Sequence, residues 1–391
     1  MSSSRAAVDY DALEATTAIE DITNDEYSQE ILRSLRDDDG DVTRLCICDE
    51  AYDIGDYRPE SSEELDWLGH FAKKSTHLDE FGMCESGAFN KCSQQSIDGF
   101  FEDIGKCNRI RKFYFHCIND LPEIIRKLDP AIKNNNITHC TLEECGLRET
   151  DVNHIFAAFR DMTGLEELSI DGGQHDLDDG IMAGCIPALA ACKGMRKLKL
   201  ISLNLSTGSS AALSAVFPRM TALQELNLDC NIIGNVGAEV LVRGLADCKH
   251  LHSLRLQFNE IGDDGLAMLI QGLPTSVDTL DLTGNEITLA RQLPLLKFKV
   301  LILSYNTLST GGPGIIAASL ANPECRLEVL HLFSANIGDG GVAVVAESLR
   351  SNQRLTQLTF DDENITERGW NAFFPILCNP ASINATHGSN H

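Results

Sequence analysis

The sequence predicts an α/β solenoid, in which parallel strands line one side of a stack and helices line the other. An apolar spacing L-x-x-L-x-L begins at Leu223 and again at Leu251, 28 residues later. Each copy carries an asparagine at its ninth position, Asn231 and Asn259. Each copy is followed by a helical stretch, such as GAEVLVRGL at 237–245. Because one strand and one helix return at a fixed period, neighbouring repeats should stack and bury a continuous core.

The same template fits twelve times along the chain, and position 1 of each repeat is its first apolar residue. Steps between neighbouring starts range from 21 to 36 residues and cluster near 28. The first two copies keep only the strand part of the pattern. The starts are Val42, Leu78, Ile110, Ile137, Leu165, Met195, Leu223, Leu251, Val277, Phe298, Leu327 and Leu355.

This pattern resembles the ribonuclease-inhibitor-like subclass of leucine-rich repeat proteins, in which a strand and a full helix recur every 28 to 29 residues. The resemblance implies an α/β leucine-rich repeat horseshoe (solenoid) with a parallel concave sheet and convex helices, of about 12 repeats. Side chains at positions 4 and 6 should fill the core, and the asparagine at position 9 should bond to backbone groups in the turn. Because one scaffold hosts many unrelated activities, the resemblance leaves the function open.

Four segments are expected along the chain. Residues 1–24 are acidic and lack sustained periodicity, which predicts a disordered segment. Residues 25–41 carry a helical pattern that ends in DDDG, which predicts a capping helix and a turn. The repeat array should fill residues 42–376, and residues 377–391 should form a flexible tail.

Two departures from the regular pattern matter for the array. The repeat that starts at Val277 has only 21 residues and contains Pro294, so its helix should be shortened or lost. Near the other end of the array, Trp370 and Phe373 lie in an apolar stretch that should close the core.

Composition bounds the class of protein and of partner. The net charge of -26 makes nucleic acid an unfavourable partner and favours a basic one. No run of 18 apolar residues occurs, which predicts no membrane span. The first residues lack the apolar core of a signal peptide. We therefore expect a monomer in the cytoplasm, with the nucleus as the alternative, whose 14 cysteines are mostly thiols.

The main candidate binding site is a group of apolar residues at exposed strand positions of the later repeats. Side chains at positions 3, 5, 7 and 8 lie on or beside the concave sheet, about 4.8 Å from their equivalents in the next repeat. Grouped aromatic and aliphatic side chains on such a surface indicate a protein-binding hot spot, unless a repacked loop buries them. The candidate residues are Phe258, Val300, Ile302, Tyr305, Val329, His331 and Phe333.

Carboxylates form a second candidate site at positions 7 and 8. Glu143, Glu144, Asp171 and Asp229 would make an acidic strip that no base at an adjacent position 7 neutralises. Such a strip suits the docking of a basic protein, and solubilisation of the chain is the alternative. Catalysis by paired carboxylates is disfavoured, because the repeats supply neither a nucleophile nor a pocket.

Soft donor atoms recur at position 7 of the first three repeats. Cys48, Cys84 and His116 would stand in a row, with Cys46 on the same strand as Cys48 and Cys117 beside His116. Zinc coordination and a redox-sensitive thiol pair are both open alternatives. Because cysteines are often small buried hydrophobes and no CxxC pair supports a metal, we assign no metal site here.

The preferred function is a non-catalytic scaffold that binds a protein partner on its concave face. No nucleotide-binding, metalloprotease or hydrolase motif occurs, and we expect neither catalytic residues nor a cofactor. One alternative is a GTPase regulator of the Ran-activating type, a family built from similar repeats, although no acidic tail follows the array here. The other alternative is an acidic inhibitor or sensor of a basic protein, similar to ribonuclease inhibitor.

Overall fold

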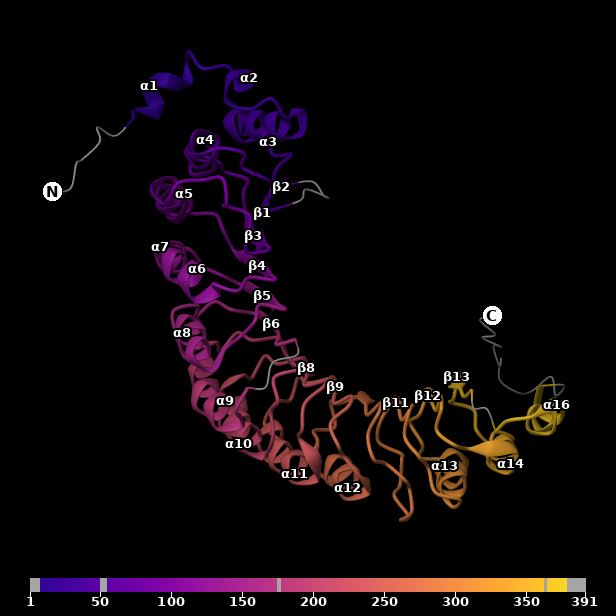
Figure 1. Cartoon of the computed structure of the whole chain (residues 1–391). Helices are drawn as coiled ribbons and strands as arrows, with labels where there is room; N and C mark the ends of the chain where they lie inside the picture. The colour runs from indigo at the N-terminus through magenta and orange to yellow at the C-terminus, as the bar shows by residue number, and fades with distance from the viewer. Residues whose placement is uncertain (1–7, 50–54, 174–176, 362–363, 378–391) are drawn as a thin grey trace. The chain divides into compact units, whose positions relative to one another are not determined.

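The computed structural model describes residues 8–49, 55–173, 177–361 and 364–377. The chain divides into two compact units, residues 1–173 and 174–391, called unit 1 and unit 2 below. Within each unit the strands pair in parallel and follow one another in chain order, except that β2 lies outside β1 at the edge. The helices of a unit lie on one side of its strands (Figure 1). We call the other side of the sheet the open face.

Unit 1 alternates strands with single helices or short helix pairs. Its elements are α1 (Tyr10–Glu14), α2 (Ile19–Ile22), α3 (Glu26–Asp37), β1 (Arg44–Cys48), β2 (Asp56–Tyr57), α4 (Ser62–Ala72), β3 (Glu80–Cys84), α5 (Gln94–Lys106), β4 (Lys112–His116), α6 (Leu121–Lys127), α7 (Asp129–Asn134), β5 (His139–Glu143), α8 (Glu149–Phe159) and β6 (Glu167–Asp171).

Unit 2 continues the alternation with shorter strands. Its elements are α9 (Asp179–Cys185), η1 (Ile186–Ala191), β7 (Lys197–Ile201), α10 (Thr207–Val216), η2 (Phe217–Arg219), β8 (Glu225–Asn227), α11 (Gly234–Leu245), β9 (Ser253–Arg255), α12 (Asp263–Gly272), β10 (Thr279–Asp281), β11 (Val300–Ile302), α13 (Gly312–Ala321), β12 (Val329–His331), α14 (Gly338–Ser348), β13 (Gln357–Thr359), α15 (Glu367–Trp370), η3 (Asn371–Phe373) and α16 (Phe374–Leu377).

The strand positions confirm the repeat register that the sequence predicts. Each of the twelve predicted repeats contains a strand that begins at its position 3, from Arg44 in β1 to Gln357 in β13. The sequence template misses β2, whose Tyr57 pairs with Ile47 and is fully buried. The architecture is therefore the predicted leucine-rich repeat solenoid, with one more strand than the template finds.

Alternate strand residues build the core. At positions 4 and 6 of the β7 repeat, Leu198 and Leu200 are fully buried, and the same holds for Leu254 and Leu256 in the β9 repeat. Each buried leucine contributes about 1.5–3 kcal/mol relative to an exposed one. Because side chains alternate along a strand, burial of positions 4 and 6 leaves positions 3, 5 and 7 for the open face.

Asparagines at position 9 satisfy the backbone where each strand turns away. The Asn231 Oδ1 accepts hydrogen bonds from Leu203 N at 3.1 Å and Leu205 N at 3.0 Å. Its Nδ2 donates to the carbonyl of Leu200 at 2.8 Å, and Asn259 repeats the pattern one repeat later. The predicted backbone role of these asparagines is confirmed. In an earlier repeat the thiol of Cys145 takes the position and donates to the Phe115 carbonyl.

The shortened repeat has no helix in the described residues between β10 and β11, as its length and Pro294 predict. A carboxylate organises this connection instead. Asp263, in the first turn of α12, accepts hydrogen bonds from the amides of Thr288, Leu289 and Ala290, each at 2.9 Å. Burial works against the charged carboxylate, but hydrogen bonds from Thr288, Ala290 and Leu289 outweigh it and lower the pKa of Asp263.

This lowered pKa gives a testable pH dependence. Because Asp263 binds protons more weakly in the folded chain, its stabilisation is complete above the unfolded pKa of about 3.9 and is lost as the pH falls through the folded pKa. We expect the stability difference between wild type and Asp263→Asn to shrink below about pH 4 in urea titrations. Asp264→Asn, which changes an exposed neighbour, is the control. A difference that stays constant down to about pH 2 would contradict the assignment.

The prediction of disorder for residues 1–24 is wrong for its described part, residues 8–24. The segment forms α1 and α2, and Ile19 is only 2% exposed. The Tyr10 hydroxyl donates to Asp66 at 3.1 Å, and its ring lies 4.8 Å from that of Trp67 on α4. The partner surface lies 56 residues away in the sequence, so the local pattern does not reveal it. Residues 1–7 lie outside the described residues.

Short elements cover both ends of the described array. Next to the first repeat, α3 buries Ile31, Leu32 and Leu35 and packs against α4, at the position where the sequence predicts a capping helix. At the other end, the ring of Phe360 lies 5.2 Å from Trp370 and 5.3 Å from Phe373. These rings close the last repeat as expected. Of the predicted tail, residues 378–391 lie outside the described residues.

Candidate binding surface on the open face

The predicted apolar residues of unit 2 lie together on the open face, and none of the seven is buried. Val300 and Ile302 of β11 pair in register with Val329 and His331 of β12. Positions 3 and 5 of two adjacent strands therefore form a small apolar lattice. The alternative that a repacked loop buries these residues does not hold, because all seven remain partly or fully exposed, whereas Leu289 and Leu295 of the helix-free connection are buried.

Three aromatic side chains extend this lattice beyond the strand ends. Phe258 is 51% exposed and Tyr305 is 54% exposed, although large aromatic side chains are usually mostly buried in folded proteins. The ring centroids of Tyr305 and Phe333 are 5.2 Å apart. Phe258 lies over Gly284 so closely that a Cβ on that glycine would overlap its ring. We use the name aromatic patch for the seven predicted residues, Phe258, Val300, Ile302, Tyr305, Val329, His331 and Phe333.

Backbone conformation at position 8 explains why these rings are exposed. Phe258 and Tyr305 have φ of 51° and 54°, in the left-handed region. Among the described residues, position 8 is left-handed in nine repeats, at Glu85, Cys117, Glu144, Ser202, Cys230, Phe258, Gly284, Tyr305 and Ser334. A left-handed residue interrupts the alternation of the strand, so its side chain leaves the core side and reaches the rim of the open face. Sequence spacing carries no signal for this conformation.

His331 is the polar member of the aromatic patch. Burial lowers the pKa of its imidazole, against the nearby carboxylate of Asp281, so the ring is neutral at pH 7. Its Nε2 lies 3.5 Å from the Gln357 side-chain nitrogen on β13. A neutral imidazole offers a directional hydrogen bond inside an otherwise apolar surface.

In unit 1 the predicted acidic residues are accessible on the open face. Glu143 and Asp171 are partly exposed and paired in register on β5 and β6, and Glu144 is exposed at position 8. The Tyr114 hydroxyl donates to Glu143 at 3.1 Å, and burial together with that carboxylate raises the pKa of Tyr114. Glu143, Glu144 and Asp171 thus remain the candidate members of the acidic strip in unit 1.

Asp229 does not belong to the acidic strip, contrary to the sequence prediction. It lies in unit 2, is 6% exposed, and accepts a hydrogen bond from the Arg255 guanidinium at 3.0 Å. The Gln257 amide donates to the same carboxylate at 2.8 Å. The prediction looked for bases only at position 7, whereas Arg255 reaches across from position 5 of the next repeat. Burial raises the pKa of Asp229 against the lowering effect of the Gln257 amide and Arg255.

The structure does not assemble the candidate zinc ligands Cys48, Cys84 and His116. Cys48 is buried, and its thiol faces the Tyr57 carbonyl at 3.8 Å, because β2 covers this edge of the sheet. The Sγ of Cys84 lies 3.3 Å from that of Cys46. Neither Cys48 nor Cys84 belongs to the groups of close metal-type donors among the described residues, whereas His116 does.

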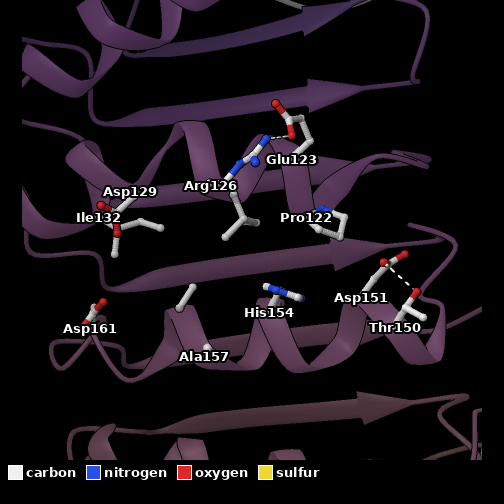
Figure 2. A pocket seen from close by; sticks show the side chains of 12 residues that line it. Pro122, Glu123, Arg126, Asp129, Ile132, Thr150, Asp151, His154, Ala157 and Asp161 are labelled. Carbon is white, nitrogen blue, oxygen red and sulfur yellow. Dashed lines mark hydrogen bonds and ion pairs between the residues drawn. The ribbon is translucent and has the colours of Figure 1, made fainter.

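A groove lies on the helix side of unit 1, away from the open face. It has a volume of about 630 Å³ and runs between α6, α7 and α8. Figure 2 shows Pro122, Arg126 and Ile132 on one wall and His154 and Ala157 on the other. The repeat pattern gives no signal for this groove, because its walls come from helices of different repeats.

A family model agrees with the repeat architecture. A sequence profile described as "Leucine Rich repeat" matches residues 220–242, 247–269 and 325–346. Among solved structures, an internalin from Listeria monocytogenes covers 96% of this chain and 98% of its own, with 14% identity and a TM-score of 0.45. No helix in the described ranges combines the length and apolar character needed to cross a membrane.

Ribonuclease inhibitors are among the similar curated proteins. That of Mus musculus is 26% identical over 259 residues, which cover 65% of this chain and 51% of the inhibitor. That of Sus scrofa is 28% identical over 248 residues, or 62% and 49%. NACHT, LRR and PYD domains-containing protein 3 of Bos taurus is 26% identical over 215 residues, or 55% and 19%. The chain spans about half the length of the inhibitors it matches. With strands in register and asparagines in the turns, the chain has the leucine-rich repeat architecture, and it is similar to ribonuclease inhibitors over about 60% of its length.

Proposed function

We propose that the chain is a non-catalytic scaffold that binds a protein partner on the open face of unit 2, through the aromatic patch. The observation that carries the proposal is the exposure of Phe258 and Tyr305 beside the Val300–Val329 lattice. Binding hot spots are enriched in large aromatic side chains that a partner can desolvate. The Tyr305 hydroxyl and the neutral His331 ring add the few polar groups that orient a partner.

The position of the aromatic patch favours a partner that lies across several repeats. Val300 and Val329 stand on adjacent strands, and Phe258 reaches toward them over Gly284, from two repeats before Tyr305. The strands hold the lattice residues in fixed register, so a partner would meet a pre-organised surface and little ordering would oppose binding. The backbone amides of Tyr305 and Phe258 are bonded to the Phe333 and Thr283 carbonyls, which fixes the aromatic residues too.

A double substitution, Tyr305→Asp with Phe333→Asp, tests the proposal. We expect partner capture from native extract to fall about 100-fold or more, since each aromatic hot-spot residue contributes about 2 kcal/mol or more. Captured proteins would be identified by mass spectrometry and their affinities measured with purified partner. Circular dichroism and the melting curve should stay nearly unchanged, because Tyr305 and Phe333 are not buried.

Val344→Asp is the matched control, since Val344 is 46% exposed on α14, on the helix side of the same unit. It should leave capture intact. Equal capture by the double variant and wild type would rule out the aromatic patch as the binding site, and unfolding of the double variant would show that these residues stabilise the core.

The identity of the captured protein separates the alternative functions. Salt-sensitive capture of a basic ribonuclease would favour the inhibitor or sensor function. This alternative is supported by the similarity to ribonuclease inhibitors and by the carboxylates Glu143, Glu144 and Asp171. A small GTPase whose hydrolysis is stimulated would favour the Ran-activator type. No residue of this chain is assigned to GTP hydrolysis.

A further inference from the structure

We propose that His116, Cys117 and Glu144 form a site for one zinc ion at the rim of the open face in unit 1. Their donor atoms all lie within 4.8 Å of one another. The His116 Nε2 is 3.6 Å from the Cys117 Sγ, and that sulfur is 3.7 Å from the Glu144 Oε2. The proposal is independent of the aromatic patch, which lies in unit 2.

The local backbone explains how two consecutive residues reach one point. Side chains of neighbouring strand residues normally point to opposite faces, so His116 and Cys117 would diverge in an extended strand. Cys117 has φ of 55° and Glu144 has φ of 51°, both at position 8. The left-handed turn after β4 brings the Cys117 thiol to the side that already carries the His116 ring. The same turn one repeat later brings Glu144 alongside.

Hydrogen bonds hold both turns in place. The Cys117 amide donates to the Glu143 carbonyl at 3.0 Å, and the Glu144 amide donates to the Asp171 carbonyl at 3.2 Å. The Ser86 hydroxyl donates to the Cys117 carbonyl at 3.3 Å and accepts from the Asn119 amide at 2.7 Å. The three donors therefore stand on a fixed backbone, and only side-chain rotations are needed to refine the geometry.

Two of the three distances between donors match those around a tetrahedral ion, and the third, between His116 and Glu144, is within 4.8 Å. With Zn–S near 2.3 Å and Zn–N near 2.0–2.1 Å, tetrahedral coordination separates sulfur from nitrogen by about 3.6 Å. With a carboxylate oxygen at 2.0–2.2 Å, it separates sulfur from oxygen by about 3.5–3.7 Å. The observed separations are 3.6 Å and 3.7 Å. Since Glu144 is exposed, water can complete the fourth position.

The donor types select the metal. A thiolate, an imidazole and a carboxylate suit zinc, which binds sulfur, nitrogen and oxygen. Calcium and magnesium prefer oxygen ligands only, so this set does not suit them. The other close group of donors among the described residues is Asp11, Glu14 and His70, and its carboxylates already pair with a lysine. The Lys74 ammonium lies 2.7 Å from Asp11 and 2.6 Å from Glu14.

Cobalt(II) binding to the reduced full chain under anaerobic conditions tests the site. Cobalt takes the tetrahedral geometry of zinc and reports a thiolate ligand by sulfur-to-metal charge-transfer absorption. We expect about one equivalent to bind with this absorption, and zinc to displace it. Zinc affinity would be measured by competition with a chromophoric chelator.

Substitutions of the three ligands should remove binding selectively. Cys117→Ser should abolish the charge-transfer absorption, and His116→Gln or Glu144→Gln should weaken zinc binding by roughly tenfold or more, since even outer-shell changes weaken metal binding 10- to 100-fold. Cys230→Ser is the matched control in a chain with 14 cysteines, because Cys230 is exposed at the same left-handed position 8 with φ of 57°. It should bind cobalt as wild type does.

Three results would overturn the proposal: wild type without the thiolate absorption, Cys117→Ser with the absorption retained, or equal losses in Cys117→Ser and Cys230→Ser. Melting curves of the metal-free variants separate binding from folding. If Cys117→Ser is unstable, Glu144→Gln decides, because Glu144 is exposed, and unchanged zinc affinity in that variant rules out the site.

Discussion

Asn231→Ala is expected to lower the free energy of unfolding by about 3–5 kcal/mol, since each buried polar group left without a partner costs about 1–3 kcal/mol. The substitution takes the acceptor from the amides of Leu203 and Leu205. It also takes a donor from the carbonyls of Leu200 and Asp229, whereas the Leu228 carbonyl keeps its hydrogen bond from the Asn259 Nδ2. Asn231 is 5% exposed, so water does not replace these bonds without opening the turn.

Urea denaturation with native-state hydrogen exchange would measure this effect. Repeats contact mainly their neighbours, so the loss of protection should concentrate at the turn that contains Leu203 and in the β8 repeat. Asn371→Ala, at an exposed asparagine of η3, is the control and should change stability by less than about 0.5 kcal/mol. Similar unfolding midpoints for the two variants would show that the position 9 asparagine is not needed for stability.

Gly244→Ala is expected to destabilise the chain by about 1–3 kcal/mol, although alanine is the better helix former. Gly244 lies in α11 where that helix meets α10, and a Cβ there would overlap the backbone of Ser214. Backbone atoms cannot rotate away as a side chain can. The two helices must therefore separate, and the leucines between them lose contacts.

Gly99→Ala is expected to change stability in the opposite direction from Gly244→Ala. Gly99 lies in the middle of α5, and a Cβ there would meet no atom within 4 Å. The alanine should therefore stabilise by about 0.5–1 kcal/mol. Thermal unfolding of both variants beside wild type measures the pair. Stabilisation by Gly244→Ala would mean that helix propensity, rather than close packing against Ser214, decides at that site.

The part of the binding surface that lies on the strands could be predicted from sequence, because side chains alternate between the two faces of a strand. Val300, Ile302, Val329 and His331 fall at positions 3 and 5, and their exposure follows from the burial of positions 4 and 6. Asp229 was misplaced for the converse reason. It occupies an open-face position by spacing, but the guanidinium of Arg255 on the next strand covers it. Spacing gives the face of a side chain and not which neighbour covers it.

The N-terminal segment and the proposed zinc ligands also depend on contacts that sequence spacing does not predict. Tyr10 is ordered by Asp66 and Trp67, and the Cys117 thiol meets Glu144 only because both residues are left-handed. The apolar spacing does not reveal the contact of Tyr10, and it places Cys117 and Glu144 at position 8 without giving their left-handed dihedrals. Cys48, Cys84 and His116 stand in a row in register, as the spacing predicts, but Cys48 is buried and the His116 ring lies beside the Cys117 thiol, so the three do not form a cluster of donors.

By itself the sequence determined one strand for each of the twelve repeats, the register of these strands, the asparagine turns and the missing helix after β10, but not β2. These features depend on which residues face the core. That choice follows a fixed local spacing, which is visible within each repeat by itself. Only the tertiary structure decided the left-handed position 8, the pairing of Asp229 and the close donors at His116. Those depend on backbone dihedrals and on neighbours from other repeats, to which apolar spacing along one strand is blind.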